Sequence, residues 1–332
     1  MFEKSESTAE GSKSAPPDCA VVVSTRNRSA KIAALIASVL VSCGPSLELV
    51  VVDQSEDSKT KAALARFRND PRLRYVKSDA RGTSRGRNLG AALTTAPIIA
   101  ITDDDCIVPP DWLEHMVEPF ERDPQVGVVF CNVDPVPVDE VGITPSIQFH
   151  ETRTLHTLDE GWQSAREQAV LGAGMAVRRT AFDALRGFDE LLGPGSVFPA
   201  CEDNDLMWRA LARDWAVHQT TETTVLHDGF RNMDELRGLV HRDCYGAGGA
   251  MAKYVRAGYL SVLPVIANGV YKLGVHGPVQ DMLSRRFPRG FKRPYWLMQG
   301  MYEGLRIPID ATTLLYRGND EDRARRFSLT HT

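Results

Sequence analysis

The first 131 residues alternate short, wholly apolar runs with stretches of helical periodicity, and this alternation limits the possible folds more than any other feature. Apolar runs of strand length lie at 19–23, 47–52, 97–101 and 126–131. Apolar residues recur with helical spacing over 32–40, and again over 112–120 after Pro109 and Pro110. Strands that are apolar on both faces and separated by helices are typical of parallel βαβ units. We therefore expect an α/β fold with a mostly parallel sheet flanked by helices.

The pattern changes after residue 132. Three prolines and scattered polar residues over 133–165 predict loop and edge structure that covers a cleft. Helical spacing returns near 180–186 and 202–213, and from about residue 233 the pattern is mostly helical. The first residues are polar, without the apolar segment of a secretory signal. We expect a disordered leader at 1–17, an α/β domain at 18–230 and a helical extension at 231–332.

Composition and charge narrow the class of protein. Of the 332 residues 43% are hydrophobic, which is enough for a sizeable core and excludes a largely disordered chain. The net charge of −4, from 39 basic and 43 acidic residues, gives no reason to expect a nucleic-acid partner. The apolar stretch at 259–271 contains Pro264 and is shorter than the roughly 20 residues that cross a bilayer. Six scattered cysteines without metal-ligand spacing indicate free thiols and a reducing cytoplasm.

Polar residues follow three of the predicted strands at the point where each strand ends. Ser24, Thr25, Arg26, Asn27 and Arg28 follow the first strand, Asp53, Gln54 and Ser55 the second, and Asp103, Asp104 and Asp105 the strand at 97–101. In an open parallel sheet the ligand crevice lies outside the carboxyl ends of the strands. We therefore expect these three groups to form one binding rim.

Several nucleotide-binding classes lack their required motif. The first turn holds no glycine, which excludes a dinucleotide-binding G-x-G-x-x-G turn and the G-x-G-T-R turn of a nucleotidylyltransferase. No G-x-x-x-x-G-K-[ST] segment is present, so a P-loop is also excluded. The residues His241, Arg242 and Asp243 match part of a kinase catalytic loop, but the Asn that such a loop needs does not follow.

The acid triplet Asp103 to Asp105 indicates a cation site. Adjacent carboxylates repel one another, and a divalent ion such as Mg²⁺ or Mn²⁺ relieves that repulsion through hard oxygen ligands. The alternative is a solvated loop that leads into the helix at 112–120. The triplet alone leaves both interpretations open.

A second acidic pair, Glu202 and Asp203, opens the predicted helix at 202–213. Asp203 precedes Leu206 and Met207 by three and four residues, so it lies on the core-facing side and could act as a general base. Capping of the helix start is the commoner explanation for acids at this position. His227 follows a strand-like run and is ambiguous by itself.

Taken in order, the motifs resemble those of the inverting family 2 glycosyltransferases of the GT-A type. The set comprises STRNR, VVVDQSED, GTSRGRNLGAAL, ITDDDC, RGFDELLG, EDNDLMWR and LHDG, over roughly 19–230. The resemblance implies a Rossmann-like GT-A domain with a nucleotide-binding half at 18–132 and an acceptor-binding half at 133–230. Two departures are Gly174, where many relatives carry Asn, and Gln54 in D-Q-S, where D-D-G-S is frequent.

The resemblance also implies roles for individual residues. Asp53 would bind the nucleotide base, Arg87 the base or diphosphate, and Asp203 would be the general base. The residues implied for the nucleotide are Ser24, Thr25, Arg26, Asn27, Arg28, Asp53, Ser55, Arg87, Asn88, Asp103 and Asp104. Those implied for the donor sugar or acceptor are Gly172, Gly174 and Glu202, and those implied for the metal are Asp105, Asp103 and His227.

The expected function is therefore a metal-dependent, inverting transfer of a sugar from a nucleoside-diphosphate sugar, with UDP favoured and Mg²⁺ or Mn²⁺ as cofactor. The acceptor is open between a saccharide, a lipid-linked glycan and a small natural product. The alternatives are a retaining enzyme and a non-catalytic sugar-nucleotide-binding scaffold of the same fold. The basic and aromatic segment at 283–296 predicts either a contact with the inner face of the membrane or packing against the catalytic domain.

Overall fold

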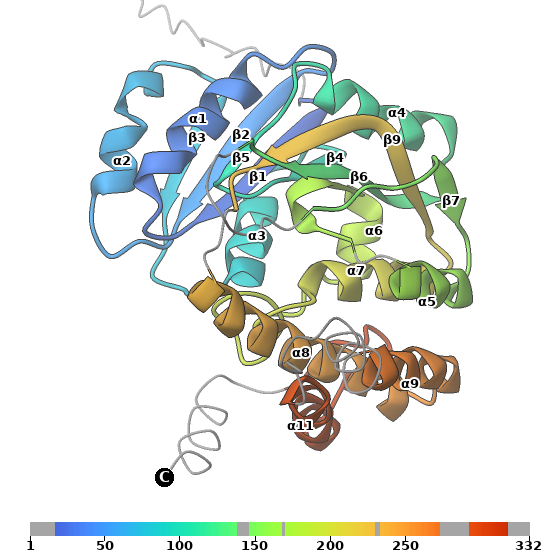
Figure 1. Ribbon diagram of the computed structural model, residues 1–332. Helices are drawn as coiled ribbons and strands as arrows, with labels where there is room; N and C mark the ends of the chain where they lie inside the picture. The colour runs from blue at the N-terminus through green and yellow to red at the C-terminus, as the bar shows by residue number, and fades with distance from the viewer. Residues whose placement is uncertain (1–16, 138–145, 168–169, 230–232, 273–291, 318–332) are drawn as a thin grey trace, which may run out of the picture.

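The apolar runs form the centre of one mixed sheet (Figure 1). The computed structural model describes residues 17–137, 146–167, 170–229, 233–272 and 292–317. Within them the strand order is β3 (Leu73–Lys77), β2 (Leu47–Asp53), β1 (Cys19–Thr25), β4 (Ile98–Ile101), β8 (Met175–Arg178), β6 (Val126–Pro135), β9 (Ala216–His227) and β5 (Cys106–Ile107), with β7 (Arg153–Leu155) also paired to β9. Residues 1–16 of the predicted leader and 283–291 of the basic segment lie outside the described residues.

Six of the nine described strands run in the same direction, which confirms the mostly parallel sheet. β5, β7 and β8 run against them. The predicted strands at 19–23, 47–52, 97–101 and 126–131 correspond to β1, β2, β4 and β6. Val21 to Val23 and Val50 to Val52 are fully buried, because helices cover both faces of this part of the sheet.

Helices connect and cover these strands. In chain order they are α1 (Ser29–Leu40), α2 (Lys59–Ala63), α3 (Thr83–Ala92), α4 (Trp112–Arg122), α5 (Leu158–Glu167), α6 (Arg179–Ala184) and α7 (Glu202–Leu211). α1 and α4 bury the apolar stripes that the sequence predicts, including Ile32, Ile36, Trp112 and Met116. The helices expected near 180–186 and 202–213 are α6 and α7.

The segment at 133–165 departs in part from its prediction. It holds the edge strand β7, but α5 begins within it at Leu158. The buried residues of α5 are Gly161, Trp162 and Ser164, so the helix lacks the leucine and isoleucine periodicity that would have predicted it. β3 was also not predicted, because its side chains are only partly buried or exposed.

The C-terminal part is helical, as expected, in the residues that are described. α8 (Met233–Arg256), α9 (Leu263–Tyr271) and α11 (Lys292–Arg306) form a layer beyond α7 (Figure 1). Gly248 of α8 and Gly300 of α11 lie against the backbone of the opposite helix, where no side chain would fit. Among the described residues no helix combines the length and the hydrophobicity that a membrane crossing requires.

Candidate active site

The strand ends bring the predicted polar groups together at one rim of the sheet. β1 and β2 end in register, with Thr25 beside Asp53. The Thr25 hydroxyl donates to Asp104 Oδ2 at 2.6 Å, which joins the end of β1 to the loop after β4. Arg28 donates from Nη1 to Asp104 Oδ1 at 3.0 Å and to Asp105 Oδ2 at 2.7 Å. The loops after β1 and β4, which are distant in sequence, therefore form one charged cluster beside the end of β2.

Asp53 organises one end of this rim. It is fully buried, and its Oδ1 accepts from the Ser55 N–H at 2.8 Å while Oδ2 accepts from the Tyr75 hydroxyl at 2.7 Å. Burial alone would raise the pKa of Asp53, but these hydrogen bonds and the charge of Lys77 hold it below its ordinary value. The Asn27 N–H donates to the Ser55 hydroxyl at 2.8 Å from a left-handed backbone with φ 58°. The carboxylate thus stays ionised and shapes both loops.

The three carboxylates of the acid triplet have different partners. Asp104 and Asp105 are buried, and burial raises the pKa of Asp104 to about 6 despite the nearby charge of Arg28. Burial would also raise the pKa of Asp105, but the hydrogen bond from His227 and the charges of His227 and Arg28 lower it overall. Asp105 Oδ1 lies 3.2 Å from His227 Nε2. Asp103 accepts a hydrogen bond from Arg87 instead.

The residues at Asp105 fit a divalent cation. Possible ligand atoms of Asp105, Cys106 and His227 lie within 4.8 Å of one another, because Cys106 and His227 are paired across β5 and β9. Burial raises the pKa of Cys106 well above its ordinary value, so its thiol keeps the proton and is a poor ligand. A carboxylate oxygen and an imidazole nitrogen remain, and both suit an ion such as Mn²⁺.

Arg87 of α3 connects the acid triplet to the acid pair. Its side chain is 2% exposed, and it donates from Nη2 to Asp103 Oδ1 at 2.8 Å and from Nη1 to Glu202 Oε1 at 3.1 Å. The guanidinium also lies over the Phe188 ring, 5.4 Å from its centroid. One arginine therefore fixes the start of α7 beside the loop that follows β4.

Asp203 is held by donors on both carboxylate oxygens. Oδ2 accepts from the Gly172 N–H at 2.9 Å, and Oδ1 accepts from the Asn204 N–H at 2.7 Å and from its side-chain amide at 3.0 Å. Glu202 and Asp203 are 6% and 8% exposed. Burial raises the pKa of both, and the charge of Asp203 raises that of Glu202 further. The pair is therefore suited to exchanging a proton nearer neutral pH than an exposed carboxyl.

At the two predicted glycines, neighbouring side chains occupy the space that a Cβ would need. A Cβ on Gly172 would lie 2.8 Å from the Arg87 guanidinium, so the glycine lets the arginine pass behind the acid pair. A Cβ on Gly174 would lie 2.7 Å from Cys131 Sγ and 3.2 Å from Val133 Cγ2. Cys131 thus fills the space that an asparagine side chain would need at position 174.

Three predicted residues lie at the margin of the cluster. The Asn88 amide donates to the Phe188 carbonyl at 3.0 Å and accepts from its N–H at 2.8 Å, so it holds the turn after α6. Arg26 pairs with Glu56 at 3.3 Å between two exposed loops. Ser24 is half-buried at the end of β1, against Gly86 of α3. Their roles toward a ligand stay predictions.

Asp243 of α8 is a candidate site residue that the sequence did not predict. This residue keeps exposed surface, but the surrounding protein and the charge of Asp203 raise its pKa to about 6. It shares one face of α8 with Gly246, Ala250 and Lys253, at spacings of three, seven and ten residues. The helical spacing of these residues, rather than the partial kinase motif at 241–243, is the sequence signal that predicts this shared face.

Comparison with known proteins agrees with the order of motifs. The family model described as "Glycosyl transferase family 2" matches residues 20–186, about half of the chain. The chain belongs to this family. The expectation drawn from the motifs is thereby confirmed.

Two curated relatives match part of the chain. One is the glucosyl-dolichyl phosphate glucuronosyltransferase of Haloferax volcanii, 29% identical over 162 residues, which are 48% of this chain and 51% of that protein. The other is the succinoglycan biosynthesis protein ExoO of Rhizobium meliloti, 37% identical over 103 residues, 31% of this chain and 29% of that protein. The chain thus spans about half or less of the length of these relatives.

Two solved structures match most of the chain. The mannosyltransferase PcManGT of Pyrobaculum calidifontis, in complex with GDP-Man and Mn²⁺, has a TM-score of 0.58 at 17% identity, over 89% of this chain and 90% of that one. TarS 1-349 of S. aureus has a TM-score of 0.52 at 15% identity, over 93% and 92%. These likenesses confirm the expected GT-A type of α/β fold.

Proposed function

We propose that the protein is a metal-dependent, inverting glycosyltransferase that moves a sugar from a nucleoside-diphosphate sugar, UDP-sugar favoured, to an acceptor hydroxyl. The observation that carries the proposal is the buried acid pair, joined through Arg87 to the acid triplet. The proposed proton acceptor and the proposed cation-binding carboxylates would thus lie beside each other. Membership of the family supports glycosyl transfer, and the complex of a structural neighbour with GDP-Man and Mn²⁺ supports a nucleoside-diphosphate sugar donor and a divalent metal.

In the proposed reaction Asp203 is the general base. The Gly172 N–H and Asn204 fix the orientation of its carboxylate. The acceptor oxygen attacks the anomeric carbon, its proton passes to Asp203, and the bond from the anomeric carbon to the diphosphate oxygen breaks. A single displacement inverts the anomeric carbon and forms no bond between sugar and protein.

The leaving diphosphate needs positive charge at the rim. A divalent cation held by Asp105 and His227, with Asp103 as the further predicted ligand, would neutralise that charge when bound. Arg28, half-exposed and paired with Asp104 and Asp105, is a second source of positive charge at the same place. Asp53 and Ser55 would form the contact with the nucleotide that the resemblance implies.

A ligand screen tests the proposal directly. Unfolding temperature should rise with UDP or UDP-sugars in the presence of Mn²⁺ or Mg²⁺, because a ligand that binds only the folded state stabilises it by mass action. The same screen with GDP and GDP-sugars decides the base. Transfer is then measured as release of the nucleoside diphosphate with saccharide and lipid-linked acceptors. No stabilisation by any nucleoside diphosphate would contradict the proposal.

Asp53→Ala should raise the Michaelis constant for the donor more than it lowers turnover. Contacts to the nucleotide base are equal in the ground state and the transition state, so their loss weakens binding. Steady-state kinetics with varied donor measure both constants. Asp57→Ala, a carboxylate with 46% of its side chain exposed in the same loop, is the matched control. A pure loss of turnover at unchanged donor affinity would count against the assignment.

Turnover should fall at acidic pH with a midpoint above the ordinary carboxyl pKa of about 4. The base must be deprotonated, and burial raises the pKa of both members of the Glu202–Asp203 pair. Glu202→Gln removes the like charge beside Asp203 and should move this acidic limb to lower pH. The turnover profile between about pH 4.5 and 8 measures the shift, with Glu118→Gln on α4 as control. An identical limb in the Glu202→Gln variant would exclude this coupling.

A further inference from the structure

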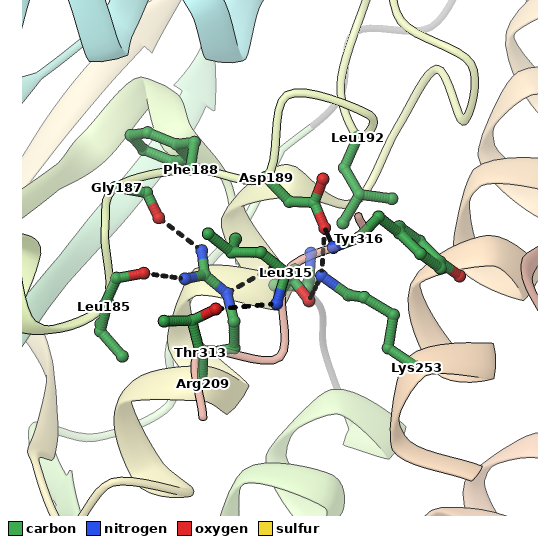
Figure 2. A network of polar contacts seen from close by, with 12 residues as sticks. Leu185, Gly187, Phe188, Asp189, Leu192, Arg209, Lys253, Thr313, Leu315 and Tyr316 are labelled. Carbon is green, nitrogen blue, oxygen red and sulfur yellow. Dashed lines mark hydrogen bonds and ion pairs between the residues drawn. The ribbon is translucent and has the colours of Figure 1, made fainter. Parts of the chain in front are cut away.

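Four charged side chains are fully buried on the inner side of α7, behind the acid pair. Asp189, Asp205, Arg209 and Lys253 are between 0% and 3% exposed, and they carry two negative and two positive charges. Lys253 Nζ lies 2.8 Å from Asp189 Oδ2 and 2.6 Å from Asp205 Oδ1. Figure 2 shows Lys253 reaching from its helix to the Asp189 carboxylate. The cluster is neutral as a whole.

The cluster joins four separate segments of the chain. Arg209 donates from Nε to Asp205 Oδ2 at 2.8 Å, and its other nitrogens donate to the carbonyls of Leu185 and Gly187 at 2.8 and 2.7 Å (Figure 2). The Tyr316 N–H donates to Asp189 Oδ2 at 2.9 Å. α7, the loop after α6, α8 and the segment around residue 316 are therefore tied at one point.

The loop from Asp189 to α7 is held by α8 at both ends. At the first end, Lys253 forms an ion pair with Asp189. Near its other end, Ala200 packs against Gly246 of α8, where a Cβ on the glycine would lie 2.8 Å from the Ala200 Cβ. Phe198 packs against Gly249. The next residues are Cys201, in a left-handed backbone with φ 69°, and then the acid pair. The path of the chain into Glu202 and Asp203 thus depends on α8.

We propose that Lys253 is a positioning residue for the transfer reaction, through which the C-terminal helices set the place of the Asp203 carboxylate. Lys253 binds Asp205, which is two residues from Asp203 in the first turn of α7. It also fixes the loop that enters this turn. The inference rests on the proposed function, since it assigns Lys253 to the same catalytic centre.

Stability alone does not account for a buried lysine at this point. Desolvation of buried ion pairs is costly, and apolar side chains of similar volume often serve stability equally well. A displacement of about 1 Å at a catalytic group, by contrast, can cost about 100-fold in rate. Two ionic contacts from one ammonium group to two segments restrict such displacement.

The test compares Lys253→Met with the charge-balanced double variant Lys253→Met/Asp189→Asn. The single variant leaves a net buried negative charge and is expected to lose stability. The double variant keeps the cluster neutral, retains the Asp205–Arg209 pair and leaves one amide oxygen to accept from either the Tyr316 N–H or the Leu191 N–H. Its turnover should be at least about tenfold lower than wild type, with the donor dissociation constant within about twofold by calorimetry with Mn²⁺. Hydrogen exchange at the amides of 202–211 should be faster.

Ile36→Ala, in the buried stripe of α1, is the control for lost stability. It should lower the unfolding temperature without a matching loss of turnover. A double variant with wild-type turnover, or with unchanged exchange in α7, would overturn the positioning role. Absence of transfer by the wild-type protein itself would instead contradict the proposed function, and faster exchange in α7 would still support the hold of Lys253 on that helix.

Discussion

Asp203→Asn should bind donor and metal almost normally and yet lose turnover by about 10²- to 10⁴-fold, the usual contribution of general base catalysis. The amide preserves the size of the side chain, and its oxygen can still accept from the Gly172 N–H or from Asn204. It cannot take a proton from the acceptor. Calorimetry with the nucleoside diphosphate and Mn²⁺ measures binding, and release of nucleoside diphosphate measures turnover.

Two further variants serve as comparisons for Asp203→Asn. Asp183→Asn, on α6 with 64% of the side chain exposed, makes the same chemical change away from the site and should leave turnover unchanged. Glu202→Gln should cause a smaller loss than Asp203→Asn, because Glu202 contacts Arg87 and orients the helix start. Near wild-type turnover in Asp203→Asn would place the base elsewhere.

Asp105→Ala should weaken metal-dependent binding of the nucleoside diphosphate by at least about 10- to 100-fold, the loss typical of disturbing even the outer partners of a metal site. Asp105 is buried between Arg28 and His227, so its removal takes away the carboxylate beside His227 and leaves Arg28 paired with Asp104 alone. A titration of each variant with and without Mn²⁺ separates metal-dependent binding from nucleotide binding alone.

His227→Ala should reduce the same metal dependence less, because a carboxylate carries charge that an imidazole lacks. Asp111→Ala, exposed just ahead of α4, is the matched control. The unfolding temperature of each variant reports whether the fold is retained. Equal affinity of the wild-type protein for the nucleoside diphosphate in EDTA and in Mn²⁺ would reject metal dependence.

Periodicity predicted the elements that bury a continuous apolar run or a single apolar stripe. β1, β2, β4 and β6 are apolar on both faces, and α1 and α4 present a single apolar stripe, so each has a clear pattern in sequence. α5 buries Gly161 and Ser164 beside Trp162, and its packing against α7 comes from tertiary contact rather than from its own pattern. No local signal distinguishes such a helix from a loop.

The rim of the site followed from topology, whereas its connections did not. Thr25, Asp53 and Asp104 meet because parallel strands end at the same edge, and this rule needs only the sequence. Arg87 joins Asp103 to Glu202, and its own contact with Glu202 spans 115 positions of the chain. Lys253 is likewise an ordinary helical lysine until α8 is placed against α7. Such long-range partners require the structure.

The contact between Gly174 and Cys131 makes the two positions interdependent in evolution. Sulfur from β6 occupies the volume into which a side chain at position 174 would project. An asparagine at 174 would therefore require residue 131 to become smaller or its sulfur to move, so a change at one position alters what the other can hold.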